Sequence, residues 1–191
     1  MPDKETNTYR TPLTRLPTKP LVLVGMMGAG KTAIGRRLAE RLDCPFLDAD
    51  DEIETAAGCS ISDIFAMHGE AAFRDGERRV IKRLLDCSPT VLATGGGAFV
   101  DADIRQAVHD KGISIWLRAD IETLWQRVRR RDHRPLLETE NPRETLERLI
   151  QDRNPTYAEA DITVDSDVGP LCKTVDRVMD AIEEFLKTES E

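Results

Sequence analysis

The chain has 191 residues, of which 40% are hydrophobic and 32% charged, and its formal net charge is −8. This composition indicates a soluble globular protein with a proper core, and no apolar run approaches the roughly 18 residues that a membrane span needs. The acidic balance disfavours nucleic acid and anionic membranes as partners, because both bind net basic surfaces.

Residues 1–19 are rich in threonine and proline and contain no apolar signal core. We expect a disordered tail there, neither a secretory signal nor an organelle transit peptide. The four cysteines form no C-x-x-C pair, and the three histidines have no ligand spacing. We therefore expect reduced thiols and a cytoplasmic location, without a disulfide framework or a structural metal site.

Residues 20–188 alternate between short apolar segments and helical patterns. A helix is expected over 121–131, capped by Asp120, and an amphipathic helix over 169–187 closes the chain. This alternation indicates one α/β domain, a three-layer sandwich with a five-stranded parallel sheet. The expected strands are at 21–25, 45–50, 90–96, 113–119 and 161–166.

The segment "GMMGAGKT", residues 25–32, fits the phosphate-loop pattern G-x-x-x-x-G-K-[ST]. Its glycines allow a tight turn whose N–H groups point at phosphate oxygens, and a helix presents its positive end to the same anion. Lys31 can reach the β- and γ-phosphates, and the Thr32 hydroxyl can ligate Mg²⁺. A glycine turn with an incidental lysine is the alternative, which the flanking strand and helix disfavour. The expected ATP-binding residues of the loop are Gly28, Ala29, Gly30, Lys31, Thr32 and Ala33.

The remaining motifs narrow the class of nucleotide-binding protein. The chain has no N-K-x-D or D-x-x-G motif, which argues against a signalling GTPase, and its third strand ends in "TGGG" without the acidic residue of an ATPase motor. The second strand ends in Asp48 and Asp50 instead. Two residues apart, these carboxylates share one side of a strand at the sheet edge where α/β proteins bind ligands. This indicates a small-molecule kinase, although helix capping is the alternative for Asp50 and Asp51.

Two arginines and a glycine triplet stand out further along the chain. Arg74 lies in "AAFRDGE" at an expected helix start, and Arg153 lies in "DRNPTY" just before an expected Asn-Pro break. Gly95, Gly96 and Gly97 follow the third strand, where a bare backbone allows close approach of a ligand. Surface arginines and an ordinary glycine turn are the alternatives.

Together these segments resemble the shikimate kinase family. The phosphate loop is followed, in the family's order, by F-x-D-x-D (46–50), F-R-x-x-E (73–77), the triple glycine, R-P-L-L (134–137), R-x-P-x-Y (153–157) and V-D-[ST] before a proline (164–170). Ala33 departs slightly, because many relatives carry a hydroxyl residue there. The resemblance implies a P-loop kinase fold with a mobile lid. It also implies phosphorylation of the 3-hydroxyl of shikimate, with ATP as co-substrate and Mg²⁺ as cofactor.

The resemblance also assigns roles to residues. Arg74 and Arg153 would form paired, charge-assisted hydrogen bonds with the shikimate carboxylate. Asp50 would accept hydrogen bonds from ring hydroxyls, either as the base or only to orient the reacting hydroxyl. The amides of Gly95, Gly96 and Gly97 would hold another substrate oxygen, and Asp48 would lie behind Mg²⁺ through water. The expected catalytic residues are Lys31, Asp50 and Arg134.

Five arginines lie between Arg127 and Arg134. A solvated helix end or a nucleic-acid arm is the alternative interpretation. The resemblance implies that Arg127 stacks on adenine and that Arg134 reaches the γ-phosphate, both as ATP-binding residues, while the arginines between them stay at the surface. The polar segment 132–142 is the expected lid, which would exclude water after both substrates bind.

Two rival functions remain at this point. A kinase acting on gluconate is disfavoured by the D-x-D, triple-glycine and R-P-L-L set. A nucleotide-binding regulator without catalysis is disfavoured by the presence of Lys31, Thr32, Asp50 and Arg134. We expect ATP and shikimate as the partners and, by analogy, a monomer.

Overall fold

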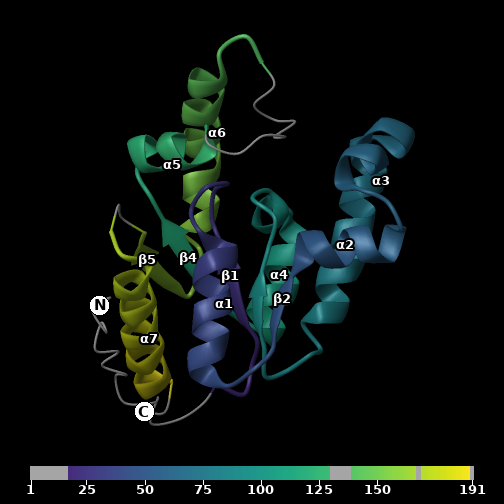
Figure 1. Cartoon of the computed structure of the whole chain (residues 1–191). Helices are drawn as coiled ribbons and strands as arrows, with labels where there is room; N and C mark the ends of the chain where they lie inside the picture. The colour runs from purple at the N-terminus through teal and green to yellow at the C-terminus, as the bar shows by residue number, and fades with distance from the viewer. Residues whose placement is uncertain (1–16, 130–138, 167–168, 190–191) are drawn as a thin grey trace, which may run out of the picture.

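The structure, a computed structural model, describes residues 17–129, 139–166 and 169–189. Within these ranges, strands and helices alternate along the chain (Figure 1). The strands are β1 (Leu21–Val24), β2 (Phe46–Asp48), β3 (Val91–Ala93), β4 (Ile113–Arg118) and β5 (Ile162–Asp165). The helices are α1 (Lys31–Leu42), α2 (Ala49–Ala57), α3 (Ile61–Leu84), the short 3₁₀ helix η1 (Ala98–Val100), α4 (Ala102–Lys111), α5 (Ile121–Val128), α6 (Pro142–Tyr157) and α7 (Leu171–Thr188).

The strands form one parallel sheet in the order β2-β3-β1-β4-β5. β1 lies at its centre, with Leu21 paired to Val91 of β3 on one side and to Ile113 of β4 on the other. Because all strands run in the same direction, their carboxyl ends meet at one edge of the sheet. The loops that carry the predicted motifs start from this edge.

Helices cover both faces of the sheet, which confirms the predicted three-layer α/β sandwich. α1 and α7 pack together on one face, and α4 and α6 lie on the other (Figure 1). β1 is buried along its whole length, whereas the edge strand β5 alternates between buried and exposed residues. This difference follows from the layers, because a central strand is covered on both faces and an edge strand is not.

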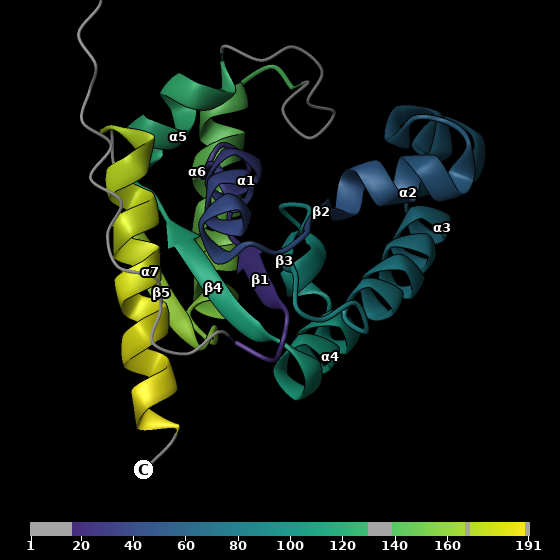
Figure 2. The ribbon, with the colours of Figure 1, turned by 60° about the horizontal axis from the view of Figure 1, so that its bottom comes forward.

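α2 and the first half of α3 stand out from the sheet edge beside β2 (Figure 2). A small apolar cluster of Ile53, Ile64 and Phe73 lies between α2 and the two halves of α3. α3 is interrupted at Gly69, whose φ of 77° is left-handed and breaks the helix. Arg74 therefore lies near the start of the second half of α3, as the sequence predicts.

Several predicted boundaries were wrong. The third strand ends at Ala93, not at residue 96. The second strand ends at Asp48, not at residue 50, and the Asp48 side chain caps α2 by accepting a hydrogen bond from the Asp50 N–H at 3.1 Å. Asp50 thus lies in the first turn of a helix, and the capping residue is Asp48. The expected break before Pro155 is also absent, because α6 continues to Tyr157. A proline in the last turn removes only one helical hydrogen bond, and the helix ends two residues later.

Four further predictions concern the cap of α5, the amino-terminal tail, membrane-spanning helices and the lid. Asp120 caps α5 by accepting a hydrogen bond from the Thr123 N–H at 2.7 Å, as predicted. At the end of the segment expected to be a tail, Pro17 is buried and the Ser88 hydroxyl donates to the Thr18 carbonyl. Among the described helices, none has the length and apolar character needed to cross a membrane. Residues 132–138 of the expected lid, with Arg134, lie outside the described residues.

Candidate active site

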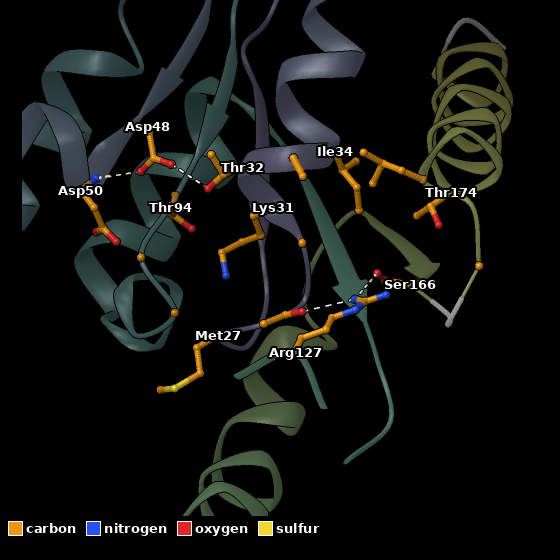
Figure 3. Close-up of a pocket in the computed structure, with 17 residues that line it drawn as sticks. Met27, Lys31, Thr32, Ile34, Asp48, Asp50, Thr94, Arg127, Ser166 and Thr174 are labelled. Carbon is orange, nitrogen blue, oxygen red and sulfur yellow. Dashed lines mark hydrogen bonds between the residues drawn. The ribbon is translucent and has the colours of Figure 1, made fainter. Parts of the chain in front are cut away.

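A cavity of about 530 Å³ opens at the carboxyl edge of the sheet. Its walls come from the phosphate loop and α1, the turn between β2 and α2, the loop after β3, α5, and the start of α7. Figure 3 shows Lys31 in the middle, with Asp48 and Asp50 on one side and Arg127 and Ser166 on the other. The cavity therefore has an acidic end and a basic end, joined across the phosphate loop.

The phosphate loop has the backbone that its glycines predict. Gly28 has a φ of 84°, and a Cβ atom there would lie 2.8 Å from Val128 Cγ2, so only glycine fits. Lys31 Nζ donates to the carbonyl oxygens of Gly25 at 2.7 Å and Met26 at 3.0 Å. These bonds hold the lysine ammonium over the loop, where it can meet an incoming phosphate group.

Thr32 and Asp48 provide two neighbouring oxygen atoms beside the loop that could act as metal ligands. The Thr32 hydroxyl donates to Asp48 Oδ2 at 2.8 Å, and Asp48 Oδ1 is held by the N–H of Asp50. Hydroxyl and carboxylate oxygens suit Mg²⁺, which usually takes one or two protein ligands and completes its shell with water and phosphate. The described residues contain no cluster of three or more His, Cys, Asp or Glu able to hold a metal. The chemistry of the Thr32 and Asp48 oxygens fits a magnesium ion that takes only one or two ligands from the protein.

Asp50 points into the cavity (Figure 3). Burial raises the pKa of its carboxyl group to about 6, the nearby charge of Asp48 adds to the rise, and Lys31 opposes it. A Cβ atom on Gly95 would lie 2.9 Å from Asp50 Oδ1, so the carboxylate lies directly against the glycine triplet. An acidic group in this position can accept a hydrogen bond, or a proton, from a hydroxyl bound in the cavity.

Arg74 approaches the same glycine triplet from α3. Its Nη1 atom donates to Glu77 Oε2 at 2.8 Å, and its Nη2 atom donates to Glu70 Oε1 at 3.2 Å. A Cβ atom on Gly97 would lie 3.1 Å from Arg74 Nη1. Burial raises the pKa of Glu77 above its ordinary value, while the hydrogen bond from Arg74 opposes that shift. The guanidinium is thus held by two carboxylates against Gly97.

Arg153 reaches the triplet from α6. Its Nη1 atom donates to the Gly96 carbonyl at 3.0 Å, and the Tyr157 hydroxyl donates to the same oxygen. Neither Arg74 nor Arg153 lines the 530 Å³ cavity, which extends as far as Gly95 and Gly96. The structure therefore brings both arginines to one glycine loop, and that loop forms part of the cavity wall.

Arg127 lies at the opposite end of the cavity. Its Nη1 atom donates to the Gly28 carbonyl at 3.2 Å and to Ser166 Oγ at 3.1 Å. Of the predicted ATP-binding residues, Ala29 is buried and does not line the cavity, and Arg134 lies outside the described residues. Those that line it are Gly28, Gly30, Lys31, Thr32, Ala33 and Arg127.

Several lining residues were not predicted as site residues. Ser166 and Gly169 lie in the segment 164–170, which carries the V-D-[ST] match to the family. Leu171 and Thr174 lie on α7 and carry no sequence signal, because an apolar residue and a threonine are ordinary in a packed helix. Only the docking of α7 beside α1 brings them to the cavity.

Comparison with known proteins identifies the family. The family model described as shikimate kinase matches residues 27–184. The chain belongs to the shikimate kinase family. It is 57% identical over 169 residues to a shikimate kinase of Paramagnetospirillum magneticum, which covers 88% of this chain and 87% of that protein.

Solved structures agree with this membership. A shikimate kinase from Acinetobacter baumannii in complex with shikimate superposes with a TM-score of 0.84 at 40% identity, over 87% of this chain and 94% of that one. A gluconokinase from Sinorhizobium meliloti has a TM-score of 0.58 at 18% identity, over 93% and 99%. The second likeness shows the fold alone. The predicted family and the predicted P-loop kinase type of fold are both confirmed.

Proposed function

We propose that this chain transfers the γ-phosphoryl group of ATP to the 3-hydroxyl of shikimate, giving shikimate 3-phosphate and ADP in aromatic amino acid biosynthesis. The observation that carries the proposal is one continuous cavity that joins the phosphate loop to Asp50 and to the glycine loop touched by Arg74 and Arg153. Membership of the shikimate kinase family supports the same substrates.

The acceptor end suits a small, polyhydroxylated carboxylate. Two guanidinium groups can bind one carboxylate through paired, charge-assisted hydrogen bonds. Asp50 would accept a hydrogen bond from a ring hydroxyl, and the amides of Gly95, Gly96 and Gly97 would hold another oxygen. In this proposed binding mode, a hydroxyl of the acceptor would lie between Asp50 and the phosphate loop.

In the proposed reaction, the acceptor hydroxyl oxygen bonds to the γ-phosphorus, and the bond from that phosphorus to the β–γ bridging oxygen breaks. ADP takes the electron pair. The hydroxyl proton goes to Asp50 if that residue is the base, or to solvent if Asp50 only orients the hydroxyl. Lys31 neutralises phosphate charge, so positioning and electrostatics supply most of the catalysis.

Three further roles complete the proposal, those of Mg²⁺, Arg127 and Arg134. Thr32 would bind Mg²⁺ directly and Asp48 through water, and the ion would neutralise phosphate charge when bound. Arg127 would stack on adenine. Arg134 would neutralise the charge of the phosphoryl group during transfer. It would do so from a lid over 132–142 that excludes water. Arg134 lies outside the described residues.

We also propose a monomeric, cytoplasmic enzyme with one domain over 20–188. Light scattering coupled to size-exclusion chromatography measures the mass directly, and a mass of twice the chain would contradict this part of the proposal.

The direct test is release of ADP from ATP and Mg²⁺ in the presence of shikimate or gluconate, with the phosphorylated product identified by mass spectrometry. We expect turnover with shikimate and background hydrolysis with gluconate. The reverse preference would assign the chain to the rival substrate. ATP binding without turnover of either acid would instead support a regulator.

Replacing Arg74 or Arg153 by alanine is expected to raise the KM for shikimate by about 10- to 100-fold, the cost of losing one hydrogen bond to a charged group. ATP affinity should survive, because neither side chain lines the nucleotide end. Titration calorimetry with each ligand measures both effects. Arg79→Ala is the matched control, since Arg79 lies on the same helix and its side chain is 76% exposed. Unchanged shikimate binding in both variants would refute the acceptor assignment.

A further inference from the structure

The hydroxyl of Ser166 joins three segments that are far apart in the sequence. Ser166 directly follows β5 and is 1% exposed. Its Oγ atom donates to the Ala29 carbonyl at 2.8 Å and accepts from Arg127 Nη1 at 3.1 Å. The phosphate loop, the end of α5 and the end of β5 therefore meet at one oxygen atom. Figure 3 shows the bond between Arg127 and Ser166.

The two bonds use the hydroxyl in a defined orientation. A serine hydroxyl has one hydrogen to donate and two lone pairs that accept. Donation to the Ala29 carbonyl consumes the hydrogen and turns a lone pair toward Arg127. The backbone fixes the serine in turn, because its N–H donates to the Arg118 carbonyl at 2.6 Å and continues the β4–β5 pairing by one residue.

Arg127 depends on such support. An arginine side chain has roughly 2 kcal/mol of rotamer entropy, which is lost when the guanidinium is held in one place. The same Nη1 atom also donates to the carbonyls of Gly28 at 3.2 Å and Ala29 at 3.4 Å, and both distances are longer than the 3.1 Å to Ser166. The serine hydroxyl therefore makes the shortest of these contacts.

We infer that Ser166 is a positioning residue for nucleotide binding. It acts by holding the Arg127 guanidinium at the basic end of the cavity before ATP arrives. The inference rests on the proposed function in taking ATP as the ligand and Arg127 as its stacking partner. Holding a binding group in place beforehand lowers the entropic cost of association. Ser166 therefore affects ATP affinity, and leaves the chemical step and the acceptor end unchanged.

The test compares wild type with Ser166→Ala by titration calorimetry with ATP and Mg²⁺ and by steady-state kinetics. We expect ATP affinity to fall and the KM for ATP to rise about tenfold, as for one lost hydrogen bond to a charged group, with kcat and the KM for shikimate within about twofold of wild type. The inference would be overturned by an equal loss of affinity for ATP and for shikimate, or by unchanged ATP affinity.

A double-mutant cycle separates positioning from a general loss of structure. In an Arg127→Ala background, Ser166→Ala should change ATP affinity by less than about twofold, because the group that it positions is gone. The same tenfold loss in both backgrounds would show that Ser166 does not act through Arg127. If Ser166→Ala fails to fold, Ser166→Cys is read in the same way, because sulfur is a weak acceptor of similar size.

Ser114 provides the matched control. It is 3% exposed, and its hydroxyl donates to Asp161 Oδ2 at 2.6 Å and accepts from the Asp161 N–H at 2.9 Å. Ser114→Ala thus removes a buried hydroxyl with two hydrogen bonds at the amino end of β4, away from the cavity. We expect a lower Tm and unchanged ATP affinity. An equal loss of ATP affinity in this variant would overturn the inference.

The two proposals can fail separately. If wild type binds ATP but does not phosphorylate shikimate, the proposed function is wrong, and calorimetry with ATP still decides the role of Ser166. If wild type phosphorylates shikimate and Ser166→Ala binds ATP normally, only the inference about Ser166 is wrong.

Discussion

Lys31→Met is expected to lower kcat by about 10²–10³-fold, the usual effect of removing one preorganised group that stabilises transition-state charge. The variant keeps most of the aliphatic stem but loses the ammonium group that lies over the carbonyls of Gly25 and Met26. Negative charge shifts toward the leaving ADP during phosphoryl transfer, so the lysine contributes most in the transition state. The effect should therefore be larger on kcat than on shikimate affinity.

Coupled measurement of ADP release gives kcat, and calorimetry gives the affinity for shikimate. Lys82→Met is the control, because Lys82 is an exposed lysine on α3. We expect it to behave like wild type. A Lys31→Met enzyme with turnover within about tenfold of wild type would remove Lys31 from the catalytic residues.

Asp50→Asn is the second change expected to have a large effect. If Asp50 takes the hydroxyl proton, kcat should fall by about 10²–10⁴-fold, the range for a positioned acid–base group. If the residue only orients the hydroxyl, asparagine keeps an acceptor oxygen and a loss of about tenfold or less is expected. The size of the loss therefore separates the two roles that the sequence leaves open.

The folded state should tolerate this substitution. Burial raises the pKa of Asp50 to about 6, which means that the charged carboxylate is disfavoured where it lies. A neutral side chain of the same shape should not lower Tm, so a drop in kcat reports on chemistry. Asp51→Asn, at the adjacent exposed position, is the matched control. Equal and small effects of both changes would contradict any catalytic role for Asp50.

The sheet and the phosphate loop could be predicted because both depend on local sequence. A strand that is buried on both faces is mostly apolar, and β1 shows this directly, because its four residues are all apolar and all buried. The loop needs glycine where φ is positive, and Gly28 has the φ of 84° that its place in the motif predicts. Both signals can be recognised from neighbouring residues alone.

Local signals were less reliable where a helix begins or ends. The pattern "FLDAD" reads as one strand, but the chain turns at Asp48, whose carboxylate caps α2. Pro155 reads as a helix break, yet α6 extends to Tyr157, which packs against Trp116 of β4 with ring centroids 6.0 Å apart. Burial of that tyrosine outweighs the single hydrogen bond that the proline removes.

The sequence by itself determined the parallel α/β sheet and the phosphate loop, because motifs and periodicity are properties of neighbouring residues, and it predicted Arg74 and Arg153 as acceptor-binding residues. Only the tertiary structure decided that Arg74 and Arg153 meet the same glycine loop, that Thr174 of α7 lines the cavity, and that Ser166 links Arg127 to Ala29. These are contacts between segments separated by tens of residues. Sheet order and helix docking fix such distances, and no local pattern encodes them.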